Sequence, residues 1–188
     1  MKIIVTRRRT TRLTMRIVKN GDVHVSAPIG LSAADIEQFI SKQQSWIEKA
    51  RSSTIDRELR RASFYAQLPL NTPQERREAE GRLNNLLLPM VRRHAQLMGV
   101  MPSRITYKAT ISRWGMCNVK TCELCFSIYL LLLPEWCVEH VVVHELCHLL
   151  EPSHNARFHA FMDRYFPRWR EARKATAALA GGSTTTGK

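Results

Sequence analysis

The fold of this chain is decided by the stretch VVVHELCHLL, residues 141–150. The apolar run and the preceding Pro134 favour a helix that continues to Leu150. Four residues turn an α-helix through about 400°, so His144 and His148 leave one face a turn apart and can bind one metal ion. Glu145 can reach a water on that ion as a general base. The alternative interpretation is a core helix with two hydrogen-bonded histidines.

The third metal ligand is expected just after this helix, because a catalytic zinc site takes three protein ligands and leaves one position open. Pro152 disfavours a helical conformation at residue 151, so the chain should turn back there and let His154 face the same ion. The competing third ligands are Glu151, His159 and Asp163. We therefore expect one zinc ion per chain, held by His144, His148 and His154.

The N-terminal part of the chain predicts β-structure followed by a helix. Residues 2–27 alternate β-prone stretches with the hairpin signal Asn20-Gly21-Asp22, which indicates an antiparallel β-meander. Ser32 is a candidate N-cap for a helix that ends near Ser52. Residues 53–72 lack clear periodicity and are interpreted as a connection.

Further along, a long helix is predicted from Pro73 to Gly99 with a kink at Pro89, then strands over 104–112 and 125–132. Helices flanking Pro167 should follow the metal-binding segment. The pattern indicates one α+β domain over residues 1–179, with a basic lobe at 1–72 and a catalytic part at 73–179. Residues 180–188 are small and polar, as in a disordered tail.

Composition is that of a globular protein with an unusual charge. The chain has 188 residues, 44% hydrophobic and 24% charged, with a formal net charge of +13. A positive field favours phosphate backbones, anionic membranes or acidic substrates. The longest apolar run is far shorter than the ~20 residues of a spanning helix, so no membrane partner is expected. Five cysteines without a visible secretory signal favour the reducing cytoplasm.

The positive charge is concentrated at the start of the chain. The first twenty residues hold seven cations and no acid. A solvated face and a polyanion-binding face are both compatible with this run. No aromatic residues are interleaved with these cations, so we do not expect bases to stack on this part of the chain. Any nucleic acid should therefore be bound without sequence preference. The candidate nucleic-acid-binding residues are Arg7, Arg8, Arg9, Arg12 and Arg16.

The cysteines raise the question of a second metal. Cys117, Cys122 and Cys125, with Cys137 or Cys147 as a fourth, could form a structural zinc site. The spacing argues against it, because zinc knuckles pair cysteines two to four apart twice over and only Cys122 and Cys125 fit.

Taken together, these residues resemble the YgjP-like metallopeptidase family, which is related to SprT-type and WLM-type proteases. The resemblance is carried by Arg113-Trp114-Gly115-Met116-Cys117, where the family has RWGSC, by the apolar strand 126–132, and by VVVHELCHLLEPSH. It implies a zincin-like minimal fold, zinc on His144, His148 and His154, and a catalytic Glu145. It also implies that the Trp114 segment lies on a strand pair beside the active-site helix. This chain departs from the family pattern at Met116 and at the cysteines of the hairpin.

The function expected from these features is zinc-dependent hydrolysis of peptide bonds, with the peptide extended along an edge strand at 125–132. Candidate contacts to the substrate or transition state are His140, Arg113, Arg157 and His159. Two rivals remain open. One is a zinc-dependent hydrolase of nucleotide phosphoanhydrides, which no glycine-rich phosphate loop supports. The other is a non-enzymatic zinc-containing nucleic-acid-binding module, in which Glu145 would be superfluous.

Overall fold

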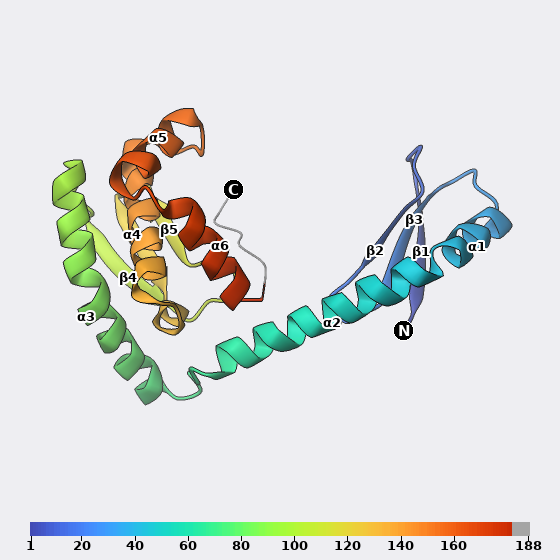
Figure 1. The fold of residues 1–188 in the computed structure, drawn as a ribbon, viewed down its shortest axis with the longest axis horizontal. Helices are drawn as coiled ribbons and strands as arrows, with labels where there is room; N and C mark the ends of the chain where they lie inside the picture. The colour runs from blue at the N-terminus through green and yellow to red at the C-terminus, as the bar shows by residue number, and fades with distance from the viewer. Residues whose placement is uncertain (182–188) are drawn as a thin grey trace. The chain divides into compact units, whose positions relative to one another are not determined.

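The structure, a computed structural model, describes residues 1–181 and has a mixed α+β fold (Figure 1). It divides into two compact units, Met1–Ala62 and Ser63–Lys188, which are described in turn. Nearly all of the predicted tail lies outside the described residues. Within them, Ala180 is buried and forms the C-cap of the last helix.

The N-terminal unit contains a three-stranded sheet in the order β1-β3-β2. Its strands are β1 (Ile3–Arg8), β2 (Thr14–Ile17) and β3 (Val23–Pro28). The hairpin between β2 and β3 is confirmed, and Gly21 takes the left-handed conformation in its turn, with φ of 80°. The predicted antiparallel meander is wrong, because β1 pairs with the far side of β3 and runs parallel to it.

Two contacts explain the parallel pairing. The Asp22 carboxylate accepts a hydrogen bond from the Lys2 backbone N–H at 2.7 Å, and Val23 N–H donates to the Lys2 carbonyl at 2.9 Å. Both hold the start of β1 beside the start of β3, which sets the direction of the strand. Alternating hydrophobicity identifies strands and their faces but does not say to which edge a strand adds.

Two helices cover one face of this sheet. Helix α1 (Ala33–Lys42) is capped by Ser32, whose hydroxyl accepts from the Asp35 N–H as predicted, and α2 spans Gln44–Ala66. Ile36 and Ile47 pack against the buried side chains of β3. The prediction of a connection over 53–72 is wrong for most of its length. Much of α2 is polar around its circumference, so it lacks the apolar stripe on which periodicity depends.

In the second unit, α3 (Pro73–Met98) begins and ends where the sequence indicates. Thr72 and Glu75 form a reciprocal capping box, Pro73 occupies the first turn, and Gly99 ends the helix with φ of 67°. The helix continues through Pro89, where a kink remains a prediction.

The second sheet also has three strands, in the order β4-β6-β5. They are β4 (Arg104–Lys108), β5 (Gly115–Asn118) and β6 (Glu123–Ser127). The strand predicted over 125–132 is therefore wrong beyond Ser127, where the chain forms a 3-10 helix, η1 (Ile128–Leu132). A short apolar run that is buried fits either state, so its pattern does not separate them. Strand β6 is central, and the edge strand beside the pocket described below is β5.

Three helices complete this unit: α4 (Glu135–Leu150), α5 (Ala156–Tyr165) and α6 (Trp169–Leu179). Helix α4 packs against α3, α5, α6 and β5 and carries much of the main core (Figure 1). Its central position makes it a rigid support for the side chains it presents. Among residues 1–181, no helix is both long and apolar enough to cross a membrane.

Candidate metal centre

Helix α4 presents both histidines of the HELCH sequence to one place. The helix ends at Leu150, and Glu151 takes an extended conformation before Pro152, as the sequence indicates. The rings of His144 and His148 are 4.9 Å apart between centroids and nearly perpendicular. They therefore lie one turn apart on the same face, as their spacing requires.

The loop between α4 and α5 brings His154 to the same point. Asn155 caps α5 by accepting a hydrogen bond from the Phe158 N–H at 3.0 Å, which fixes the chain direction just after His154. His154 Nε2 then lies 3.1 Å from His144 Nε2. One ligand nitrogen from each of His144, His148 and His154 lies within 4.8 Å of the others.

A single aromatic ring supports all three imidazoles. Phe158 is 1% exposed, and its centroid lies 5.0 Å from that of His144, 4.8 Å from that of His148 and 4.7 Å from that of His154. A buried ring in contact with all three limits their movement, so the site is pre-organised by packing.

The electrostatics of the cluster favour metal binding over protonation. Burial lowers the pKa of His144 to about 2, and it also lowers the pKa values of His148 and His154, with neighbouring imidazoles acting in the same direction. All three rings are therefore neutral at pH 7, which is the form that binds metal. His148 Nδ1 donates to the Glu151 carbonyl oxygen at 3.3 Å, which leaves Nε2 as the free acceptor.

This donor set fits zinc. Three neutral imidazoles with one side open are the ligands of a common class of catalytic zinc site. Zinc–nitrogen bonds of about 2.0–2.1 Å in a tetrahedron separate the nitrogens by roughly 3.4 Å. The 3.1 Å between His144 Nε2 and His154 Nε2 is close to that separation.

Glu145 lies beside the histidines with its side chain against β5. It is 4% exposed, and burial raises its pKa to about 8, opposed by the nearby Arg113 guanidinium. The side chain fits only because residue 115 is glycine: a β-carbon there would stand 2.6 Å from the Glu145 Cγ and Oε1. Gly115 is not among the functional residues predicted from the sequence, although glycine within a strand often marks such a close approach.

A pocket of about 450 Å³ opens over this group. Its walls come from the His144–His148 face of α4, the edge strand β5 and the loop that carries His154. Cys117, Met116 and Val119 add to the β5 side, and Met116 and Val119 are each 39% exposed there. The pocket therefore joins the histidine cluster, a carboxylate and an unpaired strand edge.

Of the four candidate contact residues, Arg113 lines this pocket. His140 does not: it is 2% exposed and packed against Phe166, and its pKa is lowered to about 4 by burial and by Arg173. The other two lie away from the lining. His159 stacks on Trp169 with centroids 5.4 Å apart, and the Arg157 guanidinium lies over the Phe161 ring.

The alternative third ligands have other partners. Asp163 accepts hydrogen bonds from Trp169 Nε1 at 2.8 Å and from Arg170. The Glu151 carboxylate accepts from Ser153 N–H at 3.3 Å. The five cysteines are free thiols, and within residues 1–181 the only cluster of three or more metal-ligating side chains is the histidine group.

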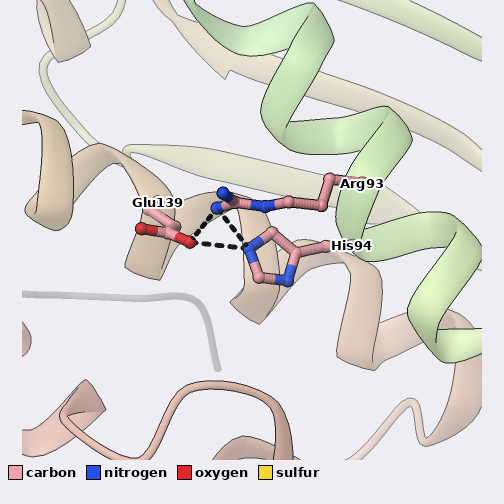
Figure 2. A network of polar contacts seen from close by, with 3 residues as sticks. All are labelled: Arg93, His94 and Glu139. Carbon is pink, nitrogen blue, oxygen red and sulfur yellow. Dashed lines mark hydrogen bonds and ion pairs between the residues drawn. The ribbon is translucent and has the colours of Figure 1, made fainter.

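A polar contact fixes α4 to α3 just before the first of these histidines. The Glu139 carboxylate on α4 accepts from His94 Nε2 at 2.7 Å and forms an ion pair with Arg93, both on α3 (Figure 2). His94 is buried, and its Nδ1 has no hydrogen-bond partner among the described residues. Glu139 therefore supplies the acceptor for this buried ring, and the Arg93 guanidinium lies 3.2 Å from the same Nε2.

The five arginines predicted to bind nucleic acid differ in their surroundings. The Arg7 side chain donates to the carbonyl oxygens of Pro28, Ile29 and Leu31. All five are exposed, and of the other four Arg8 and Arg16 lie on strands and Arg9 and Arg12 in the connection between β1 and β2. Arg7 thus has a structural role within its own unit.

Comparison with known proteins places these features in a family. A family model described as "YgjP-like, metallopeptidase domain" matches residues 11–70 and 74–178. The chain is also similar to the crystal structure of the metallopeptidase zymogen of Pyrococcus abyssi abylysin, at 17% identity and a TM-score of 0.45, over 48% of this chain and 90% of that chain. No curated protein matches the sequence. The family match includes both α4 and the loop that carries His154.

Proposed function

The chain belongs to the YgjP-like metallopeptidase family, and we propose that it is a zinc-dependent peptidase whose ion is held by His144, His148 and His154. The observation that carries the proposal is one pocket in which three neutral imidazoles, a buried carboxylate and a strand edge meet. Family membership supports a metallopeptidase. The donor set and its geometry support zinc as the ion.

The chemistry follows from the position of Glu145. Zinc at this site would polarise the scissile carbonyl and lower the pKa of a bound water to about 7. Glu145 accepts a proton from the attacking water and passes it to the leaving amine. Its burial keeps the carboxylate poorly solvated, and a poorly solvated carboxylate is a stronger base. Gly115 leaves the space that this side chain needs.

Arg113 is the best-placed of the candidate groups to contact the substrate. Its guanidinium is exposed, lines the pocket and is close enough to Glu145 to lower its pKa. A cation in this position can stabilise negative charge that develops on the carbonyl oxygen during attack. We therefore assign the oxyanion contact to Arg113 within this proposal.

The substrate peptide is proposed to lie along β5. Ser127 N–H donates to the Trp114 carbonyl at 2.9 Å, so these residues form a hydrogen-bonded antiparallel pair. Hydrogen-bonded positions alternate along such a ladder, which turns the N–H and C=O groups of Gly115 and Cys117 to the unpaired side. An extended peptide added there gains affinity from its backbone and depends little on its sequence.

The primary experiment compares the wild type with Glu145→Gln on casein and on nucleoside triphosphates, with the zinc content measured in each preparation. We expect hydrolysis of casein by the wild type and a loss of at least about a hundredfold in the variant, the scale of a lost general base, with zinc unchanged. Turnover of triphosphates in place of casein would favour the phosphoanhydride rival. Bound zinc without any hydrolysis would favour a non-enzymatic module.

A second experiment tests the position of the substrate. Peptide substrates are N-methylated at one amide at a time around the cleavage site. Because only alternate amides of an added strand face its partner, methylation should raise KM at every second position near the scissile bond and have little effect between them. A uniform effect, or none, would contradict binding along β5.

A further inference from the structure

The sheet of the N-terminal unit has one covered face and one open face. Val23, Val25 and Ala27 are buried against α1 and α2, so the odd positions of β3 face the helices. Side chains alternate between the faces of a strand, and His24 and Ser26 therefore point to the opposite side. Both residues remain partly exposed, so no helix or strand of the described N-terminal unit buries this side of the sheet.

The strand register assigns the rest of the open face. Thr6 on β1 and Thr14 on β2 are both paired with Ser26, which gives a row of three hydroxyl groups across the sheet. Arg16 and Ile4 flank His24 in the next row. Arg8 lies at the other end of β1, two residues beyond Thr6. The open face of the strands is thus made of Ile4, Thr6, Arg8, Thr14, Arg16, His24, Ser26 and Pro28, without an acidic side chain.

The two arginines of this face are available for a ligand. Both are exposed, and neither side chain forms a hydrogen bond or ion pair with another of residues 1–181. Arg7 differs because its guanidinium donates to backbone carbonyls at the end of β3. Arg8 and Arg16 can therefore bind a partner, whereas Arg7 stabilises the sheet.

We propose that this open face binds the sugar-phosphate backbone of a nucleic acid. Arginine and hydroxyl groups are typical donors to phosphate oxygens. From strand spacing and rise, Arg8 and Arg16 are roughly 16 Å apart with the hydroxyl row between them, a distance that spans several successive phosphates. The face carries no Phe, Tyr or Trp on which bases could stack, so binding depends on the backbone and not on sequence.

Charge and shape favour nucleic acid over a membrane surface. Binding to anionic lipid would combine cations with apolar side chains that insert between headgroups. On the open face, Ile4 is the single large apolar residue, and it is accompanied by three hydroxyls. The proposal is independent of the peptidase function, because these residues belong to a different compact unit from the histidine cluster.

The test uses the full-length protein and fluorescently labelled DNA and RNA of mixed sequence, titrated at several salt concentrations. Arg8→Ala with Arg16→Ala should weaken binding and reduce the slope of log affinity against log salt by roughly two units on duplex and somewhat less on single strands. The matched control is Arg57→Ala with Arg60→Ala, which removes the same charge from exposed positions of α2 in the same unit. The control should keep the wild-type slope.

A second variant tests the hydroxyl row without any change of charge. Thr6→Val, Thr14→Val and Ser26→Ala together should lower the affinity on the order of tenfold, because hydrogen bonds to a charged phosphate are lost. The valine replacements suit strand positions, and circular dichroism checks the fold. Equal effects of the two arginine pairs, or wild-type affinity in the hydroxyl variant, would overturn the proposal. Binding to phosphatidylserine vesicles but to neither DNA nor RNA would overturn it in favour of a membrane surface.

Discussion

The Glu145 side chain lies directly over the α-carbon of Gly115, so close that a β-carbon at position 115 would meet the Glu145 Cγ and Oε1 at 2.6 Å and Cδ at 2.8 Å. Real β-carbons essentially never approach other heavy atoms this closely, so any larger residue at 115 must displace the carboxylate. The edge strand β5 therefore positions the group proposed as general base on α4.

Gly115→Ala should consequently reduce peptidase activity while leaving zinc in place. Displacing a catalytic group by about 1 Å typically costs on the order of a hundredfold in rate. The control is Gly81→Ala, a position on α3 where an added β-carbon meets nothing within 4 Å. That change should raise helix stability by roughly 0.5–1 kcal/mol and leave activity unchanged. Wild-type activity in Gly115→Ala would show that Glu145 has room to move without loss.

The helix of the metal site could be predicted from the sequence. The close contact between Gly115 of β5 and Glu145 of this helix could not. Pro152 and the apolar run define where α4 ends, and ligand chemistry then limits the third position to a few residues. The role of Gly115 depends on the approach of β5 to Glu145, a tertiary relationship that no local pattern encodes. The family resemblance placed this segment beside the helix but gave no reason for the glycine.

Two predictions about the fold are wrong because both relied on hydrophobic patterning alone. Hydrophobic patterning identified β1 but not the side of β3 to which it adds, which depends on the contact between Lys2 and Asp22. It also missed most of α2, where the polar surface leaves no periodic signal. Hydrophobic patterning thus predicts helices and strands that bury one face. It does not predict strand pairing that depends on a backbone contact, or a helix that depends on intrinsic helix propensity.

Zinc content should depend on His154 and not on the residues that competed with it. His154→Ala is expected to lower the zinc affinity strongly, because two imidazoles do not complete the site. His159→Ala is the matched control, since this ring stacks on Trp169 and should leave zinc bound. Metal analysis after dialysis against a weak chelator measures both. Equal zinc in the two variants would contradict His154 as the third ligand.

The contact between α3 and α4 should contribute to stability mainly through the buried His94. Glu139→Ala removes the carboxylate that pairs with this ring at 2.7 Å, leaves only the Arg93 guanidinium 3.2 Å from His94 Nε2, and should lower the free energy of unfolding by about 1–3 kcal/mol. Arg93→Ala removes only the partner whose side chain is 59% exposed, and should cost less than about 1 kcal/mol. Urea unfolding of the zinc-loaded proteins gives both values.

A double replacement tests whether the loss in Glu139→Ala comes from the buried His94 ring. Combining Glu139→Ala with His94→Leu removes the buried polar ring that has lost its carboxylate acceptor, so part of the stability lost in Glu139→Ala should return. Losses that simply add would mean that the Glu139 effect comes from elsewhere on α4.

Ionisation of Glu145 should destabilise the metal-free protein as the pH rises from 6.5 to 8. Burial raises the pKa of Glu145 to about 8 in the folded state from an ordinary value of 4.5, so its contribution is fully present below pH 4.5 and is lost as the pH rises through 8. The buried histidines whose pKa values are lowered, His140, His144, His148 and His154, act oppositely. They are half protonated in the unfolded chain at pH 6.5, so each adds up to about 0.4 kcal/mol of stability by pH 8, while the Glu145 carboxyl alone removes about 1.7 kcal/mol. Glu145→Gln cannot ionise, so its free energy of unfolding should rise over this range while that of the wild type stays nearly level, which urea unfolding of both chelator-treated proteins at pH 6.5 and 8 measures. Parallel pH dependence in the two proteins would mean that the Glu145 carboxylate is already solvated or paired when the ion is absent, and its burial would then be a property of the loaded site alone.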